Sequence, residues 1–411
     1  MHLVTNAMYG AQSKGEDRSR AVVLLACAAF SASAAFRVCD PQLPQLALEF
    51  STTTADAAFT ITAFALAYGV LQLVYGPLGD RYGKFFVVAA AVCSSTVASV
   101  GCLLSTSLQS LIFFRGLAGA TAAAIVPMSM AWIGDAIPYE ERQLWLARFL
   151  TGTILGMAFG QLLGGITADI AGWRAAFGVL ATIYLIVGAM LMREWRRSPV
   201  DKRQQRAAPV TAVAGIFGRQ RAVIALRWPR VVLGLVCVEG ALVFGSLAFI
   251  PTFVHTRFSV SLGLAGAIAA VYAAGGIVYI LLARRLIARI GEAGLAIAGG
   301  VTLGAAFALM ALAPTWYVAA IASVACGLGF YMLHSVLQTH ATQMAPSARG
   351  TAMSLFSAAL FVGQSAGVAI GGVVVALSGI VVLFAASAAM LPALSVALYL
   401  QLRRHRVHPM G

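Results

Sequence analysis

Long runs of apolar residues dominate this sequence of 411 residues, and short polar segments separate each run from the next. Because the hydrocarbon core of a bilayer is about 30 Å thick, a helix needs about 20 apolar residues to cross it. Twelve runs reach this length. A backbone in lipid must satisfy its own hydrogen bonds, so the runs are predicted to be helices. Their approximate limits are residues 21–45, 55–76, 85–105, 109–134, 143–168, 173–192, 229–253, 262–283, 291–313, 315–341, 349–376 and 378–402.

The composition supports a membrane location. Hydrophobic residues make up 60% of the chain and charged residues 10%, whereas a soluble domain carries about 25% charged residues. Such a chain cannot cover its surface in water. The predicted fold class is therefore an all-α integral membrane protein with twelve transmembrane helices.

The formal net charge of +14 raises the question of nucleic acid binding. Nearly all basic residues lie between the apolar runs and not beside aromatic residues, so they indicate topology and no nucleic-acid partner. From Arg193 to Arg230 the chain carries ten basic residues against two acidic ones. The positive-inside rule places both termini, this segment and residues 76–84 in the cytoplasm. We expect a multi-pass protein in the lipid bilayer of the bacterial inner membrane, with an uncleaved first helix.

The cysteines and histidines give no sign of a metal site. All six cysteines lie inside apolar runs, without CxxC pairs or histidine partners, and behave as small hydrophobic residues. His334 and His340 are six residues apart and do not share a helix face well. No metal, disulfide framework or cofactor is predicted.

The two halves of the chain repeat each other. A shift of 207 residues lays Arg142 on Arg349, and a shift of 208 lays Gly83 on Gly291. The 207-residue shift also superposes Phe149 on Phe356, Gly156 on Gly363, Gly160 on Gly367, Gly164 on Gly371 and Gly165 on Gly372. Internal repeats of this size are typical of secondary transporters. We expect an N-terminal six-helix bundle at 1–192, a basic cytoplasmic linker at 193–228 and a C-terminal six-helix bundle at 229–411.

The polar segment GPLGDRYGK, residues 76–84, carries Gly76, Asp80, Arg81, Gly83 and Lys84. It resembles the signature between the second and third helices of the major facilitator superfamily. Topology and repeat agree with this resemblance, which covers essentially the whole chain. It implies the major facilitator fold, with two six-helix pseudo-repeats and transport by alternating access.

The resemblance also implies that these five residues latch the cytoplasmic side when the carrier faces outward. Asp80 and Arg81 would bond to neighbouring helix ends, while Gly76 and Gly83 would permit a tight turn and close helix approach. In the alternative interpretation Arg81 and Lys84 only anchor the topology, which would not require Asp80 between the glycines.

Ionisable groups inside membrane helices are expensive and are functional candidates by default. The first run contains SAAFRVCDPQLPQL, which places Arg37 and Asp40 three residues apart and hence on one helix face. Asp40 resembles the acidic residue in the first helix of many proton-coupled drug exporters. The alternative is an interfacial salt bridge near the end of the helix.

Two further charged residues lie inside predicted helices. Arg115, in RGLAG, resembles the R-x-x-x-G pattern that the family associates with proton coupling, although an arginine there could also reach the periplasmic headgroups. Glu239 lies about ten residues into the seventh run, without a charged neighbour in sequence. It should be protonated or paired with a helix of the other half. It is either a proton carrier, a docking point for a cationic substrate or a protonated structural residue.

Glycines recur at every fourth position of the fifth run and form a stripe that allows close approach of another helix. They are Gly152, Gly156, Gly160 and Gly164, with Gly165 adjacent. GMAFGQLLGG resembles the fifth-helix signature of the exporter branch, but Gln161 replaces its proline, which weakens the inference of antiport. Gln161 and Gln364 are candidates for substrate contact, and His334 is a candidate for lining the cavity.

The predicted function is secondary active transport, with proton-coupled efflux of a small organic or drug-like molecule as the leading hypothesis. Proton-coupled uptake of a small metabolite is the alternative within transport. A membrane enzyme or receptor is disfavoured, because neither a catalytic cluster nor a sizeable soluble domain is recognisable. We expect no enzyme activity and a monomeric carrier whose partners are protons and a small-molecule substrate.

Overall fold

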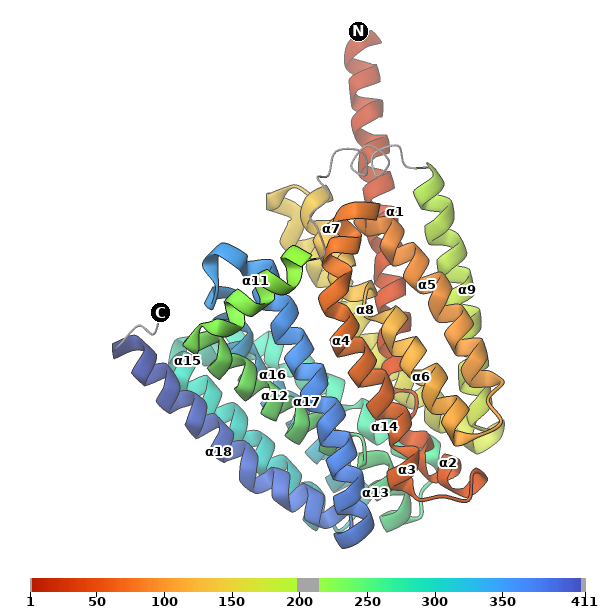
Figure 1. The fold of residues 1–411 in the computed structure, drawn as a ribbon, viewed down its shortest axis with the longest axis vertical. Helices are drawn as coiled ribbons and strands as arrows, with labels where there is room; N and C mark the ends of the chain where they lie inside the picture. Colours follow the sequence, from red (N-terminus) through yellow and green to blue (C-terminus); the bar gives the residue numbers. More distant parts are fainter. Residues whose placement is uncertain (1, 198–213, 408–411) are drawn as a thin grey trace.

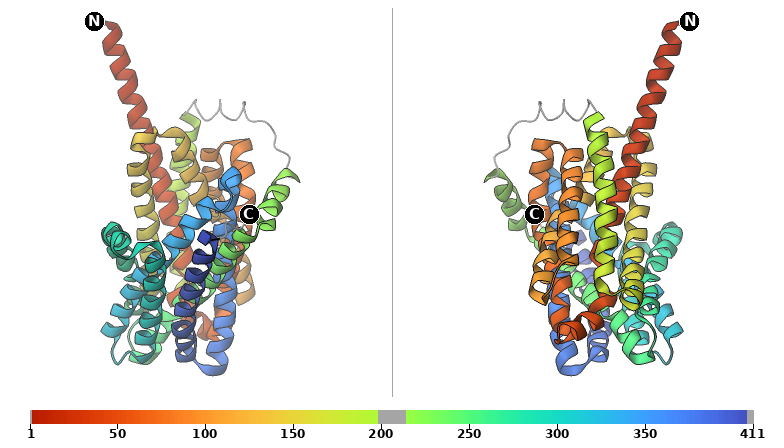
Figure 2. Two further views of the ribbon diagram at one scale, coloured as in Figure 1. Left: turned by 90° about the vertical axis from the view of Figure 1, so that its left-hand side faces the viewer. Right: turned by 90° about the vertical axis from the view of Figure 1, so that its right-hand side faces the viewer.

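The computed structural model describes residues 2–197 and 214–407, and every regular element within this part is a helix (Figure 1). At its N-terminal end α1 projects beyond the other helices (Figure 2). The elements are α1 (His2–Arg37), η1 (Asp40–Gln42), α2 (Leu43–Glu49), α3 (Thr54–Ala57), α4 (Phe59–Tyr82), α5 (Lys84–Leu103), α6 (Leu108–Ala122), α7 (Ile125–Ala136), α8 (Tyr139–Ile170), α9 (Trp173–Arg197), α11 (Ala214–Ala225), α12 (Arg227–Leu247), α13 (Ile250–Phe258), α14 (Leu262–Ala270), α15 (Tyr272–Leu312), α16 (Trp316–Gln343), η2 (Pro346–Ala348), α17 (Arg349–Ser378) and α18 (Ile380–Val407).

Among the described residues, eleven helical stretches are long and apolar enough to cross a membrane. One of them, Leu262–Leu312, has 51 residues and would measure about 75 Å as a straight helix, more than twice the thickness of the hydrocarbon core. Inside it, Gly291 has φ 68° and ψ 177° and breaks α15 between two of the predicted runs. The stretch therefore crosses twice, and the prediction of twelve membrane helices is confirmed.

The segment 76–84 is not the loop that its polarity predicts. Helix α4 continues through Gly76 and Pro77 as far as Tyr82, and the chain turns only at Gly83, where φ is 88°. Gly76 lies inside the helix, and apart from the neighbouring backbone of α4 no atom would come within 4 Å of a Cβ placed on it. The expected turn is found at Gly83, whereas Gly76 lies within the helix in this conformation. Polar residues end a membrane span without ending the helix, because they can continue it at the membrane surface.

Atomic contacts reproduce the sequence repeat. A Cβ on Gly160 of α8 would lie 2.3 Å from the carbonyl oxygen of Ala34 in α1, and a Cβ on Gly367 of α17 would lie 2.1 Å from that of Ala241 in α12. The contacted residues, like the glycines, are 207 positions apart. One turn earlier, the same offset relates Gly156 on Phe30 to Gly363 on Cys237. The halves thus share both a sequence pattern and a helix crossing.

The sharp turns obey the same relation. Gly172 and Gly379 are 207 residues apart and have φ of 83° and 88°. Gly83 and Gly291 are 208 residues apart and have φ of 88° and 68°. Since only glycine adopts such angles without strain, these positions fix where corresponding helices of the two halves end.

The stripe of four glycines in α8 packs against the backbone of α1 and of the residue that follows it, from Ala26 to Val38. Gly165 differs from them, because it lies on another face. A Cβ there would lie 2.3 Å from the carbonyl oxygen of Leu262 in α14, a helix of the opposite half. The stripe therefore joins helices within one half, whereas Gly165 belongs to the contact between the halves.

Substitution of the crossing glycines should destabilise the fold. In Gly160→Ala or Gly367→Ala the new methyl group meets a backbone carbonyl that cannot rotate away, and overpacking of this kind costs about 1–3 kcal/mol. Both variants should show a lower Tm than the parent protein in a thermal unfolding assay in detergent.

Gly234→Ala is the matched control, since Gly234 is also helical but no atom beyond the neighbouring backbone of α12 would lie within 4 Å of its Cβ. It should keep or slightly raise the Tm, because alanine is the better helix former. Equal melting of Gly160→Ala and the parent protein would contradict the packing described here.

Candidate functional site

Arg37 and Asp40 form a buried ion pair at the point where α1 ends. Arg37 is the last residue of α1, and Asp40 begins η1 with Pro41 behind it. Arg37 Nη1 donates to Asp40 Oδ2 over 3.1 Å, with exposed fractions of 4% for Arg37 and 0% for Asp40. A pair enclosed in this way is not an interfacial salt bridge, so that alternative is wrong. The break in the helix holds the pair inside the protein.

Gln161 of α8 also bonds to Asp40. Its Nε2 donates to Asp40 Oδ2 over 2.8 Å, so both hydrogen bonds reach the same carboxyl oxygen. Asp40 Oδ1 and Gln161 Oε1 are buried and have no hydrogen-bond partner among the described residues. The proline position of the exporter signature is therefore filled here by a partner of the buried acid.

Arg115 of α6 lies near this cluster and bonds to backbone carbonyls. Its Nη1 donates to Ala35 O over 2.7 Å and its Nε to Thr60 O over 3.2 Å. Ala35 is among the last four residues of α1, whose carbonyls lack partners within the helix. At 1% exposure Arg115 does not reach the headgroups, so that alternative is also wrong. It makes no hydrogen bond to Asp40 and instead stabilises the broken end of α1.

The C-terminal half has its own buried acid. Glu239 of α12 is fully buried, and its Oε2 lies 2.8 Å from Nδ1 of His334 in α16. The imidazole stacks on Phe330, with ring centroids 4.8 Å apart. The partner of Glu239 does not come from the other half, as one of the two expectations had it, because α16 belongs to the same half. Glu239 Oε1 has no partner among the described residues.

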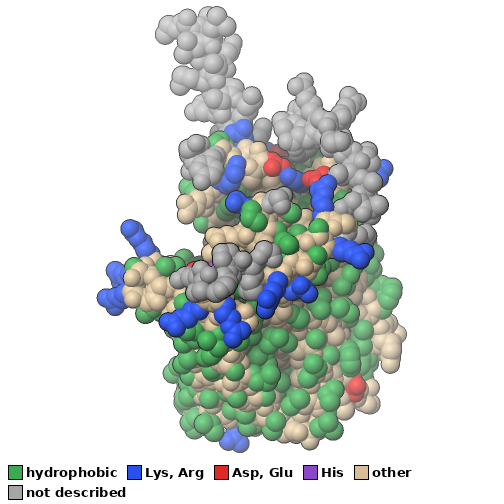
Figure 3. All heavy atoms as spheres, turned by 60° about the vertical axis from the view of Figure 1, so that its left-hand side comes forward, with side chains coloured by type: hydrophobic (Ala, Val, Ile, Leu, Met, Phe, Trp, Pro, Cys, Tyr) green, Lys and Arg blue, Asp and Glu red, His purple; other side chains and the backbone are tan. Residues whose placement is uncertain are grey.

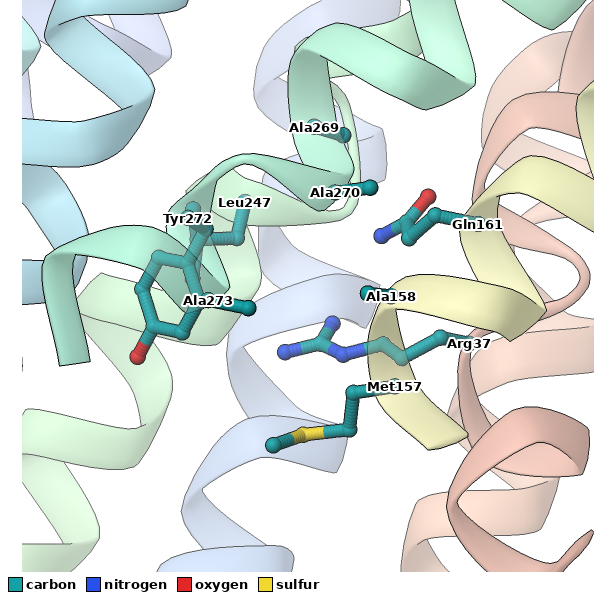
Figure 4. A pocket seen from close by; sticks show the side chains of 9 residues that line it. All are labelled: Arg37, Met157, Ala158, Gln161, Leu247, Ala269, Ala270, Tyr272 and Ala273. Atoms are coloured by element: carbon teal, nitrogen blue, oxygen red, sulfur yellow. The ribbon is translucent and has the colours of Figure 1, made fainter. Parts of the chain in front are cut away.

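A small cavity lies between the two halves, beside Arg37 (Figure 4). The guanidinium of Arg37 and the amide of Gln161 enter it from the N-terminal half, opposite Tyr272 of α15. The remaining lining residues are Met157, Ala158, Leu247, Ala269, Ala270 and Ala273. Its volume of about 20 Å³ leaves room for one water molecule. In this conformation the space beside Arg37 is therefore small.

Arg37 also reaches the opposite half through an aromatic ring. Its guanidinium carbon lies 4.8 Å from the ring centroid of Phe244 in α12. Arg37 and Phe244 are 207 residues apart, so the repeat relates them to each other. Equivalent residues can touch only close to the axis that relates the halves. Arg37 therefore lies near this axis, with a cation from one half against an aromatic ring of the other.

The two halves are joined tightly at the end that carries α13 and α14, opposite the N terminus (Figure 1). Asp169, near the end of α8, accepts hydrogen bonds from two backbone N–H groups that open α14, Leu262 N at 2.9 Å and Gly263 N at 2.7 Å. At the equivalent place, a Cβ on Gly372 would lie 3.3 Å from the Cα of Ala55. Asp169 was not among the predicted site residues, because α14 begins 93 residues further along the chain and no local pattern links the two.

The latch residues are not joined to the other half in this structure. Asp80 and Arg81 are exposed, and neither bonds to a described residue of the C-terminal half. Lys84 forms an ion pair with Asp135 of α7, within its own half. The latch stays a prediction for a conformation in which the end that carries the N terminus is closed.

Other predicted site residues are placed as follows. Gln364 of α17 is buried, and its Nε2 has no hydrogen-bond partner among the described residues. Gln364 does not line the cavity in Figure 4, and neither do Glu239 and His334. No group of three His, Cys, Asp or Glu residues that could hold a metal ion occurs in the part of the chain that the structure describes.

Comparison with known families gives one match along the chain. The family model described as Major Facilitator Superfamily matches residues 25–347 and 248–409.

Among curated proteins, the uncharacterized MFS-type transporter YceJ of Bacillus subtilis is 25% identical over 339 residues, which is 81% of this chain and 83% of YceJ. The efflux pump radE of Floropilus chiversii is 27% identical over 189 residues, or 45% of this chain and 35% of radE. The radE match therefore covers only about a third of that pump.

Solved structures share the fold at low identity. The nucleoside transporter NupG superposes with a TM-score of 0.72 at 14% identity and covers 93% of this chain and 98% of NupG. A POT family transporter in complex with 5-aminolevulinic acid gives a TM-score of 0.72 at 11% identity, covering 93% and 96%. The prediction of the major facilitator fold is confirmed.

The Asp169 contact should control how readily the closed end opens. In Asp169→Asn the amide retains one acceptor oxygen and loses the negative charge at the start of α14. Such a charge at a helix N-terminus contributes about 0.3–1 kcal/mol when exposed. The open population should rise roughly two- to fivefold. The measurement is the labelling rate of a cysteine introduced at Ala269, with a membrane-impermeant maleimide added on the side of α14 and the six native cysteines replaced.

Ser261→Ala provides the control. The Ser261 hydroxyl accepts from Leu264 N and caps the same helix from within its own half. Its loss should leave the labelling rate near that of the parent protein. Equal labelling of Asp169→Asn and Ser261→Ala would show that the bond across the halves does not hold this end closed.

Proposed function

The chain belongs to the Major Facilitator Superfamily of transporters, and on this premise we propose that it exports a small organic or drug-like molecule in exchange for protons. The observation that carries the proposal is the buried pair of Arg37 and Asp40 at the cavity between the halves. The similarity to radE, an efflux pump, supports the direction. The chain is a multi-pass membrane protein and not an enzyme.

Asp40 is the proposed proton site. A proton on Asp40 cancels the charge that compensates Arg37, so the cluster then carries a net positive charge beside the opposite half. A change of one charge there stabilises the two conformations unequally, which a carrier needs in order to switch. In the proposed cycle Asp40 takes up a proton from the periplasm as substrate leaves, and it releases the proton on the cytoplasmic side.

Glu239 and His334 are a second candidate for proton coupling or substrate contact. Their hydrogen bond joins two titratable groups in a buried position, so a proton can be held by either residue. Glu239 Oε1, Asp40 Oδ1 and Gln161 Oε1 are all buried acceptors without described partners. Acceptors of this kind favour a substrate that donates hydrogen bonds and is neutral or cationic.

The proposed location is a bacterial inner membrane, with both termini on its cytoplasmic side. On the face in Figure 3, Lys and Arg gather toward the end that carries the N terminus, while hydrophobic side chains cover most of the opposite part. The positive-inside rule then assigns the N-terminal end to the cytoplasm. Residues 1–192 and 229–411 would act as the two rocking bundles of one monomer, joined by the linker 193–228. Of this linker, residues 198–213 lie outside the described part of the chain.

Proton-coupled uptake is the second candidate function. Gln161 stands where the exporter signature has proline, and this departure favours it. A measurement of luminal pH distinguishes proton exchange from proton-coupled uptake. The purified protein is placed in proteoliposomes with a trapped pH dye and no imposed gradient, and candidate compounds are added outside. Substrate-dependent alkalinisation of the lumen supports exchange, because protons leave as substrate enters. Acidification would mean that protons and substrate enter together, and it would replace export by uptake.

Removal of the Asp40 charge should uncouple transport from protons. Asp40→Asn keeps the shape and cannot ionise, so flux driven by a pH gradient should fall at least tenfold, while counterflow of labelled against unlabelled substrate should persist. Glu49→Gln is a suitable control, because Glu49 pairs with Arg174 at the surface. Gradient-driven flux in Asp40→Asn equal to that of the control would exclude Asp40 as the proton site.

Asp80→Asn tests the proposed latch. The exposed position of Asp80 predicts an unchanged Tm and normal membrane insertion, whereas loss of the charge should abolish transport by preventing closure on the cytoplasmic side. Flux assays and a thermal unfolding curve on the same preparation check both statements. Transport at the level of the parent protein would refute the latch.

A further inference from the structure

Gln161 contacts both the buried carboxyl group of Asp40 and the opposite half of the protein. Its Nε2 donates to Asp40 Oδ2 over 2.8 Å. Its backbone carbonyl oxygen lies 2.4 Å from the position that a Cβ on Gly266 of α14 would take. One residue thus joins the proposed proton site to the contact between the halves.

The hydrogen bonds of Asp40 leave one side of the carboxyl group open. Arg37 and Gln161 both donate to Oδ2, while Oδ1 is buried without a described partner, as is Gln161 Oε1. A carboxylate only accepts hydrogen bonds, whereas a protonated carboxyl group can also donate one. An amide has donor and acceptor on the same group. Gln161 can therefore bond to Asp40 in both states, through Nε2 to the carboxylate and through Oε1 to the protonated acid.

The surroundings of Gln161 leave space for this exchange. Its amide points into the cavity of about 20 Å³, which Ala269 and Ala270 line from the opposite half (Figure 4). The terminal torsion of a glutamine side chain has a broad, roughly two-fold preference, so rotation of the amide needs little energy. A rotation at Gln161 changes the polar group that faces the other half.

The other ionisable groups on the elements around Asp40 have different partners, are exposed or are neutral. Arg115 bonds to two carbonyl oxygens, and Glu49 of α2 pairs with Arg174. Asp169 of α8 bonds to the start of α14, and His255 of α13 bonds to Val260 O. Arg257 is exposed, and Cys39 is a buried thiol. α14 itself carries no ionisable side chain. Within the described residues, only Arg37 and Gln161 form hydrogen bonds with the carboxyl group of Asp40.

We propose that Gln161 is a positioning residue that bonds to Asp40 in both of its protonation states and transmits the change between them to the contact with α14. The inference rests on the proposed function, in which Asp40 takes up the transported proton. Proline, the residue of the exporter signature at this position, has no side-chain donor or acceptor. The glutamine thus gives this chain a coupling element of its own.

The test measures flux against pH in proteoliposomes, with each curve scaled to its own maximum so that the amount of active protein does not alter the midpoint. Gln161→Met keeps the length of the side chain and removes the amide. The midpoint should move up by about one pH unit, because a hydrogen bond to the charged carboxylate is stronger than one to the protonated acid, so loss of the amide destabilises the carboxylate more than the acid. Gln161→Glu places a second carboxyl group beside Asp40, so its midpoint should rise further and its transition should broaden.

Gln72→Met is the matched control, because Gln72 is another buried glutamine of the same half that does not bond to Asp40. Its midpoint should equal that of the parent protein. An unchanged midpoint in Gln161→Met, with only a lower maximal rate, would overturn the proposal. If Gln161→Met does not fold, as judged by size-exclusion chromatography, the isosteric Gln161→Glu decides by the same criterion.

Asp40→Asn, measured in parallel, separates the two levels of the proposal. If it keeps the pH-dependent flux of the parent protein, both the proposed function and the role of Gln161 fail. If it loses that dependence while Gln161→Met and Gln161→Glu keep the midpoint of the parent protein, only the role of Gln161 fails.

Discussion

The buried ion pair between Arg37 and Asp40 is the interaction on which the centre of the molecule depends. Two charges without water must be compensated by protein groups, and removal of one partner of such a pair costs about 3–5 kcal/mol. The protein meets this demand with a break in α1, the amide of Gln161 and the ring of Phe244. Hydrophobic residues in place of a buried pair are often as stable, so stability alone does not explain the pair. Its position at the boundary of the halves favours a role in switching.

The glycine crossings determine how closely the groups of this cluster approach. Because α8 lies against the backbone of α1, the side chain of Gln161 is long enough to reach Asp40 directly. The same crossing recurs 207 residues later, but the charges do not recur. The repeat equivalent of Arg37 is Phe244, and that of Glu239 is Ala32. One scaffold is thus used twice, with a charged cluster in each half at positions that are not equivalent.

Hydropathy and repeats were sufficient to predict the number of helices, the fold class and the 207-residue register, because each depends on a pattern along the chain. Local pattern did not predict the end of α4, where polar residues continue the helix to Tyr82. The pairs of Gln161 with Asp40 and His334 with Glu239 were also missed as pairs. Their members are 121 and 95 residues apart, so their meeting depends on how helices pack. The candidates were visible in the sequence as rare polar residues in apolar runs, but their partners were not.

The central claim is that a proton on Asp40 shifts the balance between the two conformations. The most direct measurement is the distance between spin labels at Leu144 of α8 and Ile287 of α15, exposed residues of opposite halves. Pulsed electron paramagnetic resonance would record it across a pH series, in protein whose native cysteines are replaced. Acidification should shift the distance distribution of the parent protein, while Asp40→Asn should show the acidic distribution at every pH. An equal shift with pH in Asp40→Asn would contradict the claim.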